Sequence, residues 1–112
     1  MLAELGYQQY RLGHYRDAID SYRKVVALRP DESVYWATVG GLLQMVGEDY
    51  AAEVAFRRSL ALEPNESSLN NLGVILYRKG DYQGAAGLYR RAADLNPNDF
   101  YYLGNLGDAL EA

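Results

Sequence analysis

Three prolines divide the chain at almost equal intervals. Pro30, Pro64 and Pro97 are 34 and 33 residues apart, and each closes the same kind of segment. The segment begins with a helical pattern, passes through a glycine turn, continues in a second helix with aromatic and alanine side chains, and ends in Leu-x-Pro. A period of about 34 residues is typical of repeated helix–turn–helix units, each of which packs on its neighbours rather than around one central core. The period therefore constrains the fold more than any single residue does.

Apolar and small residues recur in each segment at the i, i+3, i+4, i+7 spacing of an amphipathic helix. The first helices carry this stripe at Leu2, Leu5, Gly6 and Gln9; Trp36, Val39, Gly40 and Leu43; Leu69, Leu72, Gly73 and Leu76; and Leu103, Leu106, Gly107 and Leu110. The second helices carry it at Ala18, Tyr22 and Val25; Ala52, Phe56 and Ser59; and Ala85, Tyr89 and Ala92. We predict helices over 1–12, 15–28, 33–46, 49–62, 66–79, 82–95 and 99–111.

Glycines and short polar residues mark the predicted helix ends. A glycine that ends a first helix can adopt the left-handed conformation at little cost, and this is predicted for Gly13, Gly47 and Gly80. Small polar residues after the prolines are predicted N-caps, namely Ser33, Ser67 and Asp99. A second group of glycines is predicted to let each first helix approach its partner helix closely: Gly6, Gly40, Gly73 and Gly107.

These positions together resemble the tetratricopeptide repeat (TPR) family over essentially the whole chain. The third repeat follows the family pattern almost throughout. The second repeat has Asp49 where tyrosine is usual, with Tyr50 one residue late, and Ser59 where alanine is usual. The first repeat has Gln9 and Val25 at an aromatic and an alanine position.

The resemblance implies a fold, a domain organisation and a class of function. The implied fold is all-α, a right-handed α-solenoid of about seven antiparallel helices. It would form a single array over 1–112, with repeats of about 1–32, 33–65 and 66–99 and an additional helix over 100–112. The implied function is a protein–protein interaction module that binds a protein or peptide partner, as an extended peptide or a partner helix, on its concave face. The run 98–109 also resembles TPR segments appended to bacterial signalling proteins, and we expect the chain to be part of a longer protein.

Composition argues against several other classes of function. A net charge of −4 disfavours nucleic-acid binding, which needs a basic face. His14 is the only histidine and there is no cysteine, so the chain offers no His-based triad and no cluster of His and Cys ligands for a metal. We therefore expect no enzyme activity, no cofactor and no metal. No apolar run is long enough to span a membrane and no signal peptide is visible, so the cytoplasm is the expected location.

Nine of the eleven tyrosines fall into two groups. Those at pattern positions are predicted to pack inside the repeats: Tyr15, Tyr22, Tyr82 and Tyr89, with Tyr50 expected to do the same. The others lie on first helices away from the core stripe: Tyr7, Tyr10, Tyr77 and Tyr101. The second group either lines an inner surface or covers neighbouring helices, and the sequence leaves both readings open.

In the family, the concave face of the first helices usually binds an extended peptide. The candidate binding residues on that face are Asn71, Asn105, Asn70, Thr38, Gln44, Tyr77, Arg78, Tyr7 and Tyr10. A clamp for a terminal carboxylate needs Lys and Asn on the first repeat, but this chain has Ala3, Glu4 and Tyr7 there. A ladder of side-chain amides along Asn71 and Asn105 could instead pair with peptide N–H and C=O groups. The alternative is that these asparagines are solvated helix residues.

A different class of function is a structural scaffold that assembles through its terminal helices. The last predicted helix has the apolar residues Leu103, Leu106 and Leu110 without a following second helix, and the first helix begins with Leu2 and Leu5. Exposed apolar patches of this kind tend to associate. A homodimer through either terminal helix is the expectation of this alternative.

Overall fold

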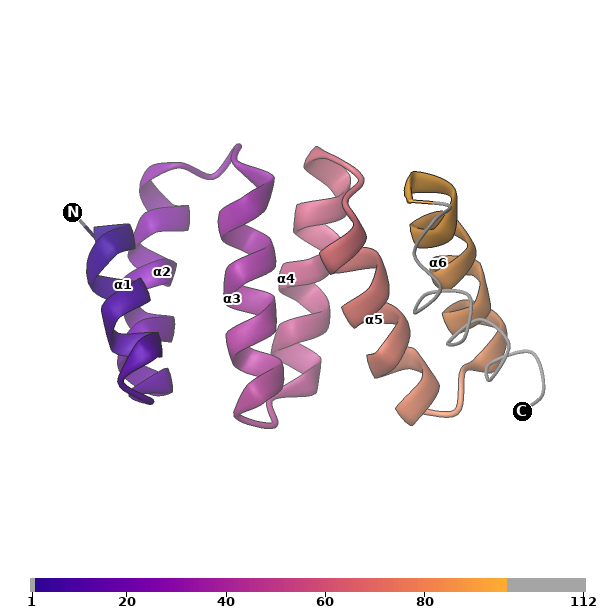
Figure 1. Ribbon diagram of the computed structural model, residues 1–112, viewed down its shortest axis with the longest axis horizontal. Coiled ribbons are helices and arrows are strands. Elements are labelled where there is room, and N and C mark those ends of the chain that lie inside the picture. Colours follow the sequence, from indigo (N-terminus) through magenta and orange to yellow (C-terminus); the bar gives the residue numbers. More distant parts are fainter. Residues whose placement is uncertain (1, 97–112) are drawn as a thin grey trace. The chain divides into compact units, whose positions relative to one another are not determined.

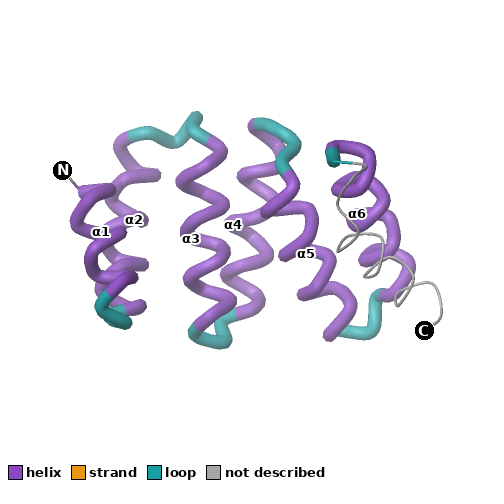
Figure 2. Tube along the Cα trace, viewed as in Figure 1, coloured by secondary structure: helices purple, strands orange, loops and turns teal. Residues whose placement is uncertain are grey.

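The computed structural model describes residues 2–96, and their regular structure is entirely helical (Figures 1 and 2). The six helices are α1 (Leu2–Arg11), α2 (Tyr15–Leu28), α3 (Ser33–Met45), α4 (Asp49–Leu62), α5 (Glu66–Arg78) and α6 (Tyr82–Leu95). They agree with the first six predicted helices to within one residue at each end. The predicted helix over 99–111 lies outside the described residues. The all-α prediction is confirmed.

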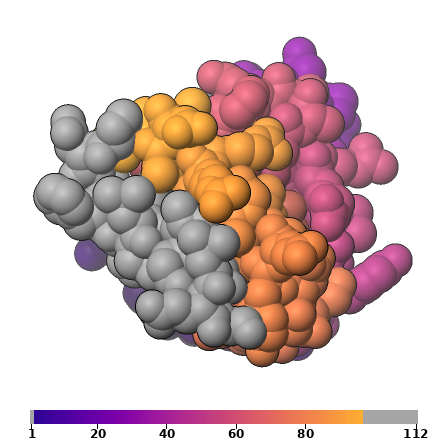
Figure 3. Space-filling view, turned by 90° about the vertical axis from the view of Figure 1, so that its right-hand side faces the viewer, coloured from indigo at the N-terminus to yellow at the C-terminus, as the bar shows by residue number. Residues whose placement is uncertain are grey.

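The chain divides into two compact units, residues 1–63 and 64–112. In unit 1, α1 packs on α2, α2 on α3, and α3 on α4. Figure 1 shows the first helices α1 and α3 in front of the second helices α2 and α4. In unit 2, α5 packs on α6. Figure 3 shows the surface of α6, coloured from orange to yellow.

The three glycine turns have the same backbone geometry. Gly13, Gly47 and Gly80 have φ values of 82°, 84° and 88°. In each turn the N–H of the residue after the glycine bonds back to the first helix at 2.9 Å, from His14 to Gln9, from Glu48 to Leu43 and from Asp81 to Leu76. This closes the helix end in the manner of a Schellman motif, for which a left-handed glycine is the preferred residue. The prediction for these glycines is confirmed.

The close-packing glycines are confirmed as well. A Cβ atom added at Gly6 would lie 2.7 Å from the ring of Tyr22, and one at Gly40 would lie 2.7 Å from the ring of Phe56. At Gly73 the added atom would lie 2.6 Å from Tyr89. Real Cβ atoms do not approach other atoms this closely, so each aromatic ring occupies the space that the missing side chain leaves. Gly107 lies outside the described residues.

Two of the predicted N-caps are wrong. The residue before α3 is Glu32, which makes no side-chain cap bond, and the residue before α5 is Asn65, whose side chain accepts from the Ser68 N–H at 2.9 Å. Ser33 instead bonds to Ser59 of α4, with 2.8 Å between the two hydroxyl oxygens and 3.0 Å from the Ser59 hydroxyl to the Ser33 carbonyl. These bonds give hydrogen-bond partners to the buried Ser59 hydroxyl, which stands where the family pattern usually has alanine. Ser67 lies within the first turn of α5, and Asp99 is outside the described residues.

The expectation that Tyr50 packs inside the repeat is also wrong. Tyr50 is 84% exposed, whereas Tyr22 and Tyr89 are buried. Asp49 occupies the position at which the other repeats have Tyr15 and Tyr82. A shift of one residue turns a side chain by about 100° around a helix, because one turn takes 3.6 residues. Tyr50 therefore points into solvent rather than toward the helix pair.

Candidate functional site

A row of tyrosines lies on the first helix of unit 1. Tyr7 and Tyr10 are each about half exposed, and their ring centroids are 6.4 Å apart. The ring of Tyr10 is 5.9 Å from that of Tyr15, which begins α2. The guanidinium of Arg11 lies 5.9 Å from the Tyr7 ring, within the range of a cation–π contact. We call Tyr7, Tyr10 and Tyr15 the tyrosine row.

A buried phenol lies beside this row. Burial raises the pKa of Tyr22, and the nearby phenols of Tyr35 and Tyr7 raise this pKa further. A hollow of about 620 Å³ opens next to these rings and is lined by Ala3, Glu4, Leu5, Tyr7, Gln8 and Tyr22. The wall of the hollow is therefore mainly aromatic and apolar, with a single carboxylate from Glu4 among the lining residues.

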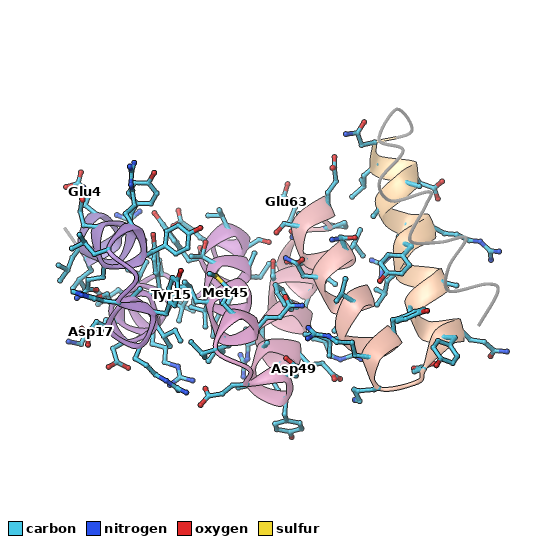
Figure 4. All side chains as sticks on the ribbon, turned by 60° about the horizontal axis from the view of Figure 1, so that its bottom comes forward. Glu4, Tyr15, Asp17, Met45, Asp49 and Glu63 are labelled. Atoms are coloured by element: carbon cyan, nitrogen blue, oxygen red, sulfur yellow. The ribbon has the colours of Figure 1, made fainter. Side chains whose placement is uncertain are left out.

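The other first helix of unit 1, α3, contains no charged residue. Nothing lies within 4 Å of the position that a Cβ atom would take at Gly41, so the backbone there is open. Gln44 is partly buried, and Met45, labelled in Figure 4, is about half exposed. The Thr38 hydroxyl donates to the Val34 carbonyl at 2.9 Å. Its proton is therefore already in use, and the hydroxyl can offer a ligand only its acceptor capacity.

Three of the candidate residues in unit 2 are accessible on α5. Asn71 is partly exposed, and its amide nitrogen is 3.5 Å from the Ser67 hydroxyl, at the outer limit of a hydrogen bond. The exposed ring of Tyr77 meets the Tyr82 ring edge-on at 5.1 Å. Arg78, the last residue of α5, is also exposed.

Asn70 does not belong with these residues. It is 9% exposed, so the expectation of an accessible amide at this position is wrong. More of the surface of α5 is buried than the predicted apolar stripe covers. Ser68, Asn70 and Ile75 are buried along with the four residues of that stripe. Asn105, the second member of the predicted ladder, lies outside the described residues.

The structure thus brings Tyr7 and Tyr10 together on α1, and Thr38 and Gln44 onto α3 of the same unit. Sequence reasoning missed the partnership of Tyr10 with Tyr15, although the five-residue separation across a glycine turn was available as a signal. It also missed the effect of Tyr35, whose phenol helps to raise the pKa of Tyr22. Among the described residues, no three acidic or histidine side chains are placed to hold a metal ion, and no helix is long and apolar enough to cross a membrane.

Comparison with known proteins supports the predicted repeats. Sequence models of the tetratricopeptide repeat match residues 1–33 and residues 67–99. These two spans coincide with the first and third repeats that the proline period predicts. The chain belongs to the tetratricopeptide repeat family. Its helix–turn–helix units are therefore TPR units.

Two curated relatives match part of this TPR chain. WspC of Pseudomonas aeruginosa, named as a probable biofilm formation methyltransferase, is 30% identical over 82 residues, which are 72% of this chain and 19% of WspC. The small glutamine-rich tetratricopeptide repeat-containing protein 2 of Mycosarcoma maydis is 24% identical over 86 residues, which are 76% of this chain and 24% of that protein. The matched part of the chain thus spans about a fifth to a quarter of the length of these relatives.

Solved TPR structures share the fold. The first TPR domain of Spaghetti (RPAP3), bound to the HSP90 peptide SRMEEVD, has a TM-score of 0.92 and 22% identity, covering 98% of this chain and 88% of that one. A crystal structure of MamA has a TM-score of 0.91 and 26% identity, covering 98% of this chain and 65% of that one. The Sgt2 TPR domain of Aspergillus fumigatus has a TM-score of 0.87 and 18% identity, covering 98% of this chain and 75% of that one.

Proposed function

We propose that this chain is a protein–protein interaction module that binds an extended peptide on the exposed faces of its first helices, the concave face of a TPR array. The observation that carries the proposal is that unit 1 has both the tyrosine row, which runs from α1 to the start of α2, and an uncharged α3 whose backbone is open at Gly41. The bound peptide of the RPAP3 domain supports the class of ligand. The chain itself supplies binding rather than catalysis.

The chemistry of these faces suits an extended chain. The flat rings of Tyr7 and Tyr10 offer apolar area at a low cost in side-chain entropy, together with hydroxyls that form hydrogen bonds. The open backbone at Gly41 allows close approach, since no side chain projects there. In unit 2, the Asn71 amide offers both a donor and an acceptor, which matches the alternating groups of a peptide backbone.

The same faces are poorly suited to a terminal carboxylate. Glu4 lines the hollow beside Tyr7, the Arg11 guanidinium lies over the Tyr7 ring, and α3 carries no cation. Like charges repel across an interface, which disfavours an acidic tail. The partner that fits unit 1 is therefore a segment with uncharged, apolar or proline-bearing side chains, which dock well on aromatic surfaces.

The test is a peptide selected from a random phage-displayed library against the 112-residue chain. Its affinity is then measured by calorimetry for the unmodified chain and for variants. Truncating a residue that contacts the peptide costs roughly 1–2 kcal/mol, so Tyr7→Ala and Tyr10→Ala should each weaken binding about five- to thirty-fold. A peptide that binds unit 2 instead should lose about two- to ten-fold in affinity on Asn71→Ala, because its backbone loses a hydrogen bond to that amide.

The matched control is Arg91→Ala, an exposed change on the second helix α6. It should leave the affinity unchanged. Equal losses from Arg91→Ala and the tyrosine variants, or none from any of them, would contradict binding on the first-helix faces.

A further inference from the structure

All of the sulfur in this chain is methionine sulfur. The sequence contains no cysteine and two methionines, Met1 and Met45, of which Met45 lies among the described residues. Met45 is the last residue of α3 and is 52% exposed, so its thioether is accessible to small molecules in solution. Methionine is commonly oxidised to its sulfoxide. In this chain no thiol competes with the thioether for an oxidant.

Met45 lies on the same side of α3 as the open backbone at Gly41. Thr38, Gly41 and Met45 are spaced by three and four residues, and residues with this spacing are neighbours on a helix surface. The neighbour of Met45 one turn earlier therefore projects no side chain, and nothing lies within 4 Å of the Cβ position there. The thioether thus borders open space on a helix that contains no charged residue.

The repeat period relates Met45 to the proposed binding face. Gly41 and Met45 follow Tyr7 and Arg11 of α1 by one period of 34 residues. The Arg11 guanidinium lies 5.9 Å from the centroid of the Tyr7 ring, so this position of a first helix borders the tyrosine row. Met45 has the equivalent position on α3. Its role below rests on the peptide binding proposed above and concerns the α3 part of that face.

A polar group at this position is compatible with the fold. The equivalent residues of α1 and α5 are Arg11 and Arg78, and both are exposed. The turn after α3 is closed by the backbone, through the bond of 2.9 Å from the Glu48 N–H to the Leu43 carbonyl. An oxygen atom on the Met45 sulfur therefore changes the surface of α3 without removing a bond that holds the turn.

We propose that Met45 is an oxidation site that regulates peptide binding, with weaker binding when the side chain is a sulfoxide. A hydroperoxide oxidises the thioether by two electrons: the O–O bond breaks, an S–O bond forms, and hydrogen peroxide is reduced to water. The product has a polar acceptor oxygen in place of an apolar, polarisable sulfur. An apolar ligand side chain that packs on Met45 then buries this oxygen without a hydrogen-bond donor, which is unfavourable.

The test treats the 112-residue chain with hydrogen peroxide and uses the peptide selected against its reduced form. Mass spectrometry of proteolytic fragments should show one added oxygen atom on Met45, and the far-UV circular dichroism should not change. Calorimetry should then show an affinity lower by about five-fold or more. Methionine sulfoxide reductases A and B, which together reduce both epimers of the sulfoxide, should return the affinity to within about two-fold of its starting value.

Met45→Leu is the matched control, because leucine has a similar volume and no sulfur. This variant should bind the peptide and lose no affinity in peroxide, although Met1 is still present to be oxidised. Equal losses of affinity in the two chains would overturn the proposal. A Met45 that peroxide leaves unmodified, or a sulfoxide at Met45 that leaves the affinity unchanged, would do the same.

Tyr7→Ala, measured in parallel, separates this proposal from the one on which it rests. If Tyr7→Ala weakens binding and oxidation of Met45 does not, peptide binding on the first-helix faces stands and the regulatory role of Met45 fails. If neither change affects the affinity, both proposals fail.

Discussion

Adjacent glycines on α3 have opposite roles. Gly40 faces Phe56, whose ring atoms lie 2.7 Å from the position of an added Cβ atom, while Gly41 has no neighbour within 4 Å. The repeat period alone predicted the packing role of Gly40, because Gly6 and Gly73 occupy the same position. Gly41 has no counterpart among the packing glycines, so only the structure shows that its position is open.

Replacing each of these glycines with alanine should change stability in opposite directions. Gly41→Ala should raise the free energy of unfolding by about 0.5–1 kcal/mol, because alanine favours the helix and nothing obstructs its methyl group. Gly40→Ala should lower it by about 1–3 kcal/mol, because the Phe56 ring must move. Urea denaturation of both variants measures whether the free energy of unfolding rises for Gly41→Ala and falls for Gly40→Ala. A destabilised Gly41→Ala variant would mean that its position is occupied.

At the scale of the helix, the three turns that lead into second helices differ in their capping. The Asp81 side chain accepts from the Gly84 N–H at 2.9 Å and so caps α6. His14 and Glu48, at the equivalent positions before α2 and α4, make no side-chain cap bond. Loss of a side-chain cap typically costs about 1 kcal/mol. Asp81→Ala should therefore destabilise the chain by about 1 kcal/mol in a urea melt, with His14→Ala as a control that changes stability by less than about 0.5 kcal/mol. Equal effects would argue against the cap.

Glu48 has a different role, because it joins two repeats. Its carboxylate accepts from the Arg16 guanidinium of α2 at 2.7 Å. This hydrogen bond holds the pKa of Glu48 below its usual value, with further lowering from the charges of Arg16 and Arg23. A lowered pKa in the folded state means that the contact stabilises the chain above the unfolded-state pKa and is lost as the pH falls through the folded-state value. An NMR titration should show the Glu48 pKa rising in Arg16→Ala, and an unchanged value would contradict the contact.

At the scale of the whole molecule, the local signals predicted the fold well. The turn glycines and the prolines depend only on the local backbone, and each packing glycine depends on one partner ring. The repeat pattern is therefore enough to predict their positions and roles. The site was less predictable because accessibility depends on tertiary packing. Asn70 is buried because α5 buries a wide arc, and the Thr38 proton is used within its own helix. Neither property can be deduced from the spacing of asparagines and threonines in the sequence.

The residues at the clamp positions of the first repeat give a prediction about ligand choice. The peptide SRMEEVD, bound by the RPAP3 domain, has three acidic residues among its last four. In this chain Ala3, Glu4 and Tyr7 stand where the family's clamp needs a lysine and an asparagine. Calorimetry with SRMEEVD should therefore give no saturable heat up to about 1 mM peptide, which corresponds to less than about 4 kcal/mol of binding free energy. Micromolar binding would show that another cation replaces the clamp.

The most direct measurement maps a ligand onto the chain without presupposing any residue. A peptide selected from a phage-displayed library is titrated into the ¹⁵N-labelled 112-residue chain, and the shifts of the backbone amide resonances are followed. Binding on the first-helix faces of unit 1 predicts that the largest shifts lie on α1 and α3, including Tyr7 and Gly41. Shifts concentrated on α2, α4 and α6 would contradict this account.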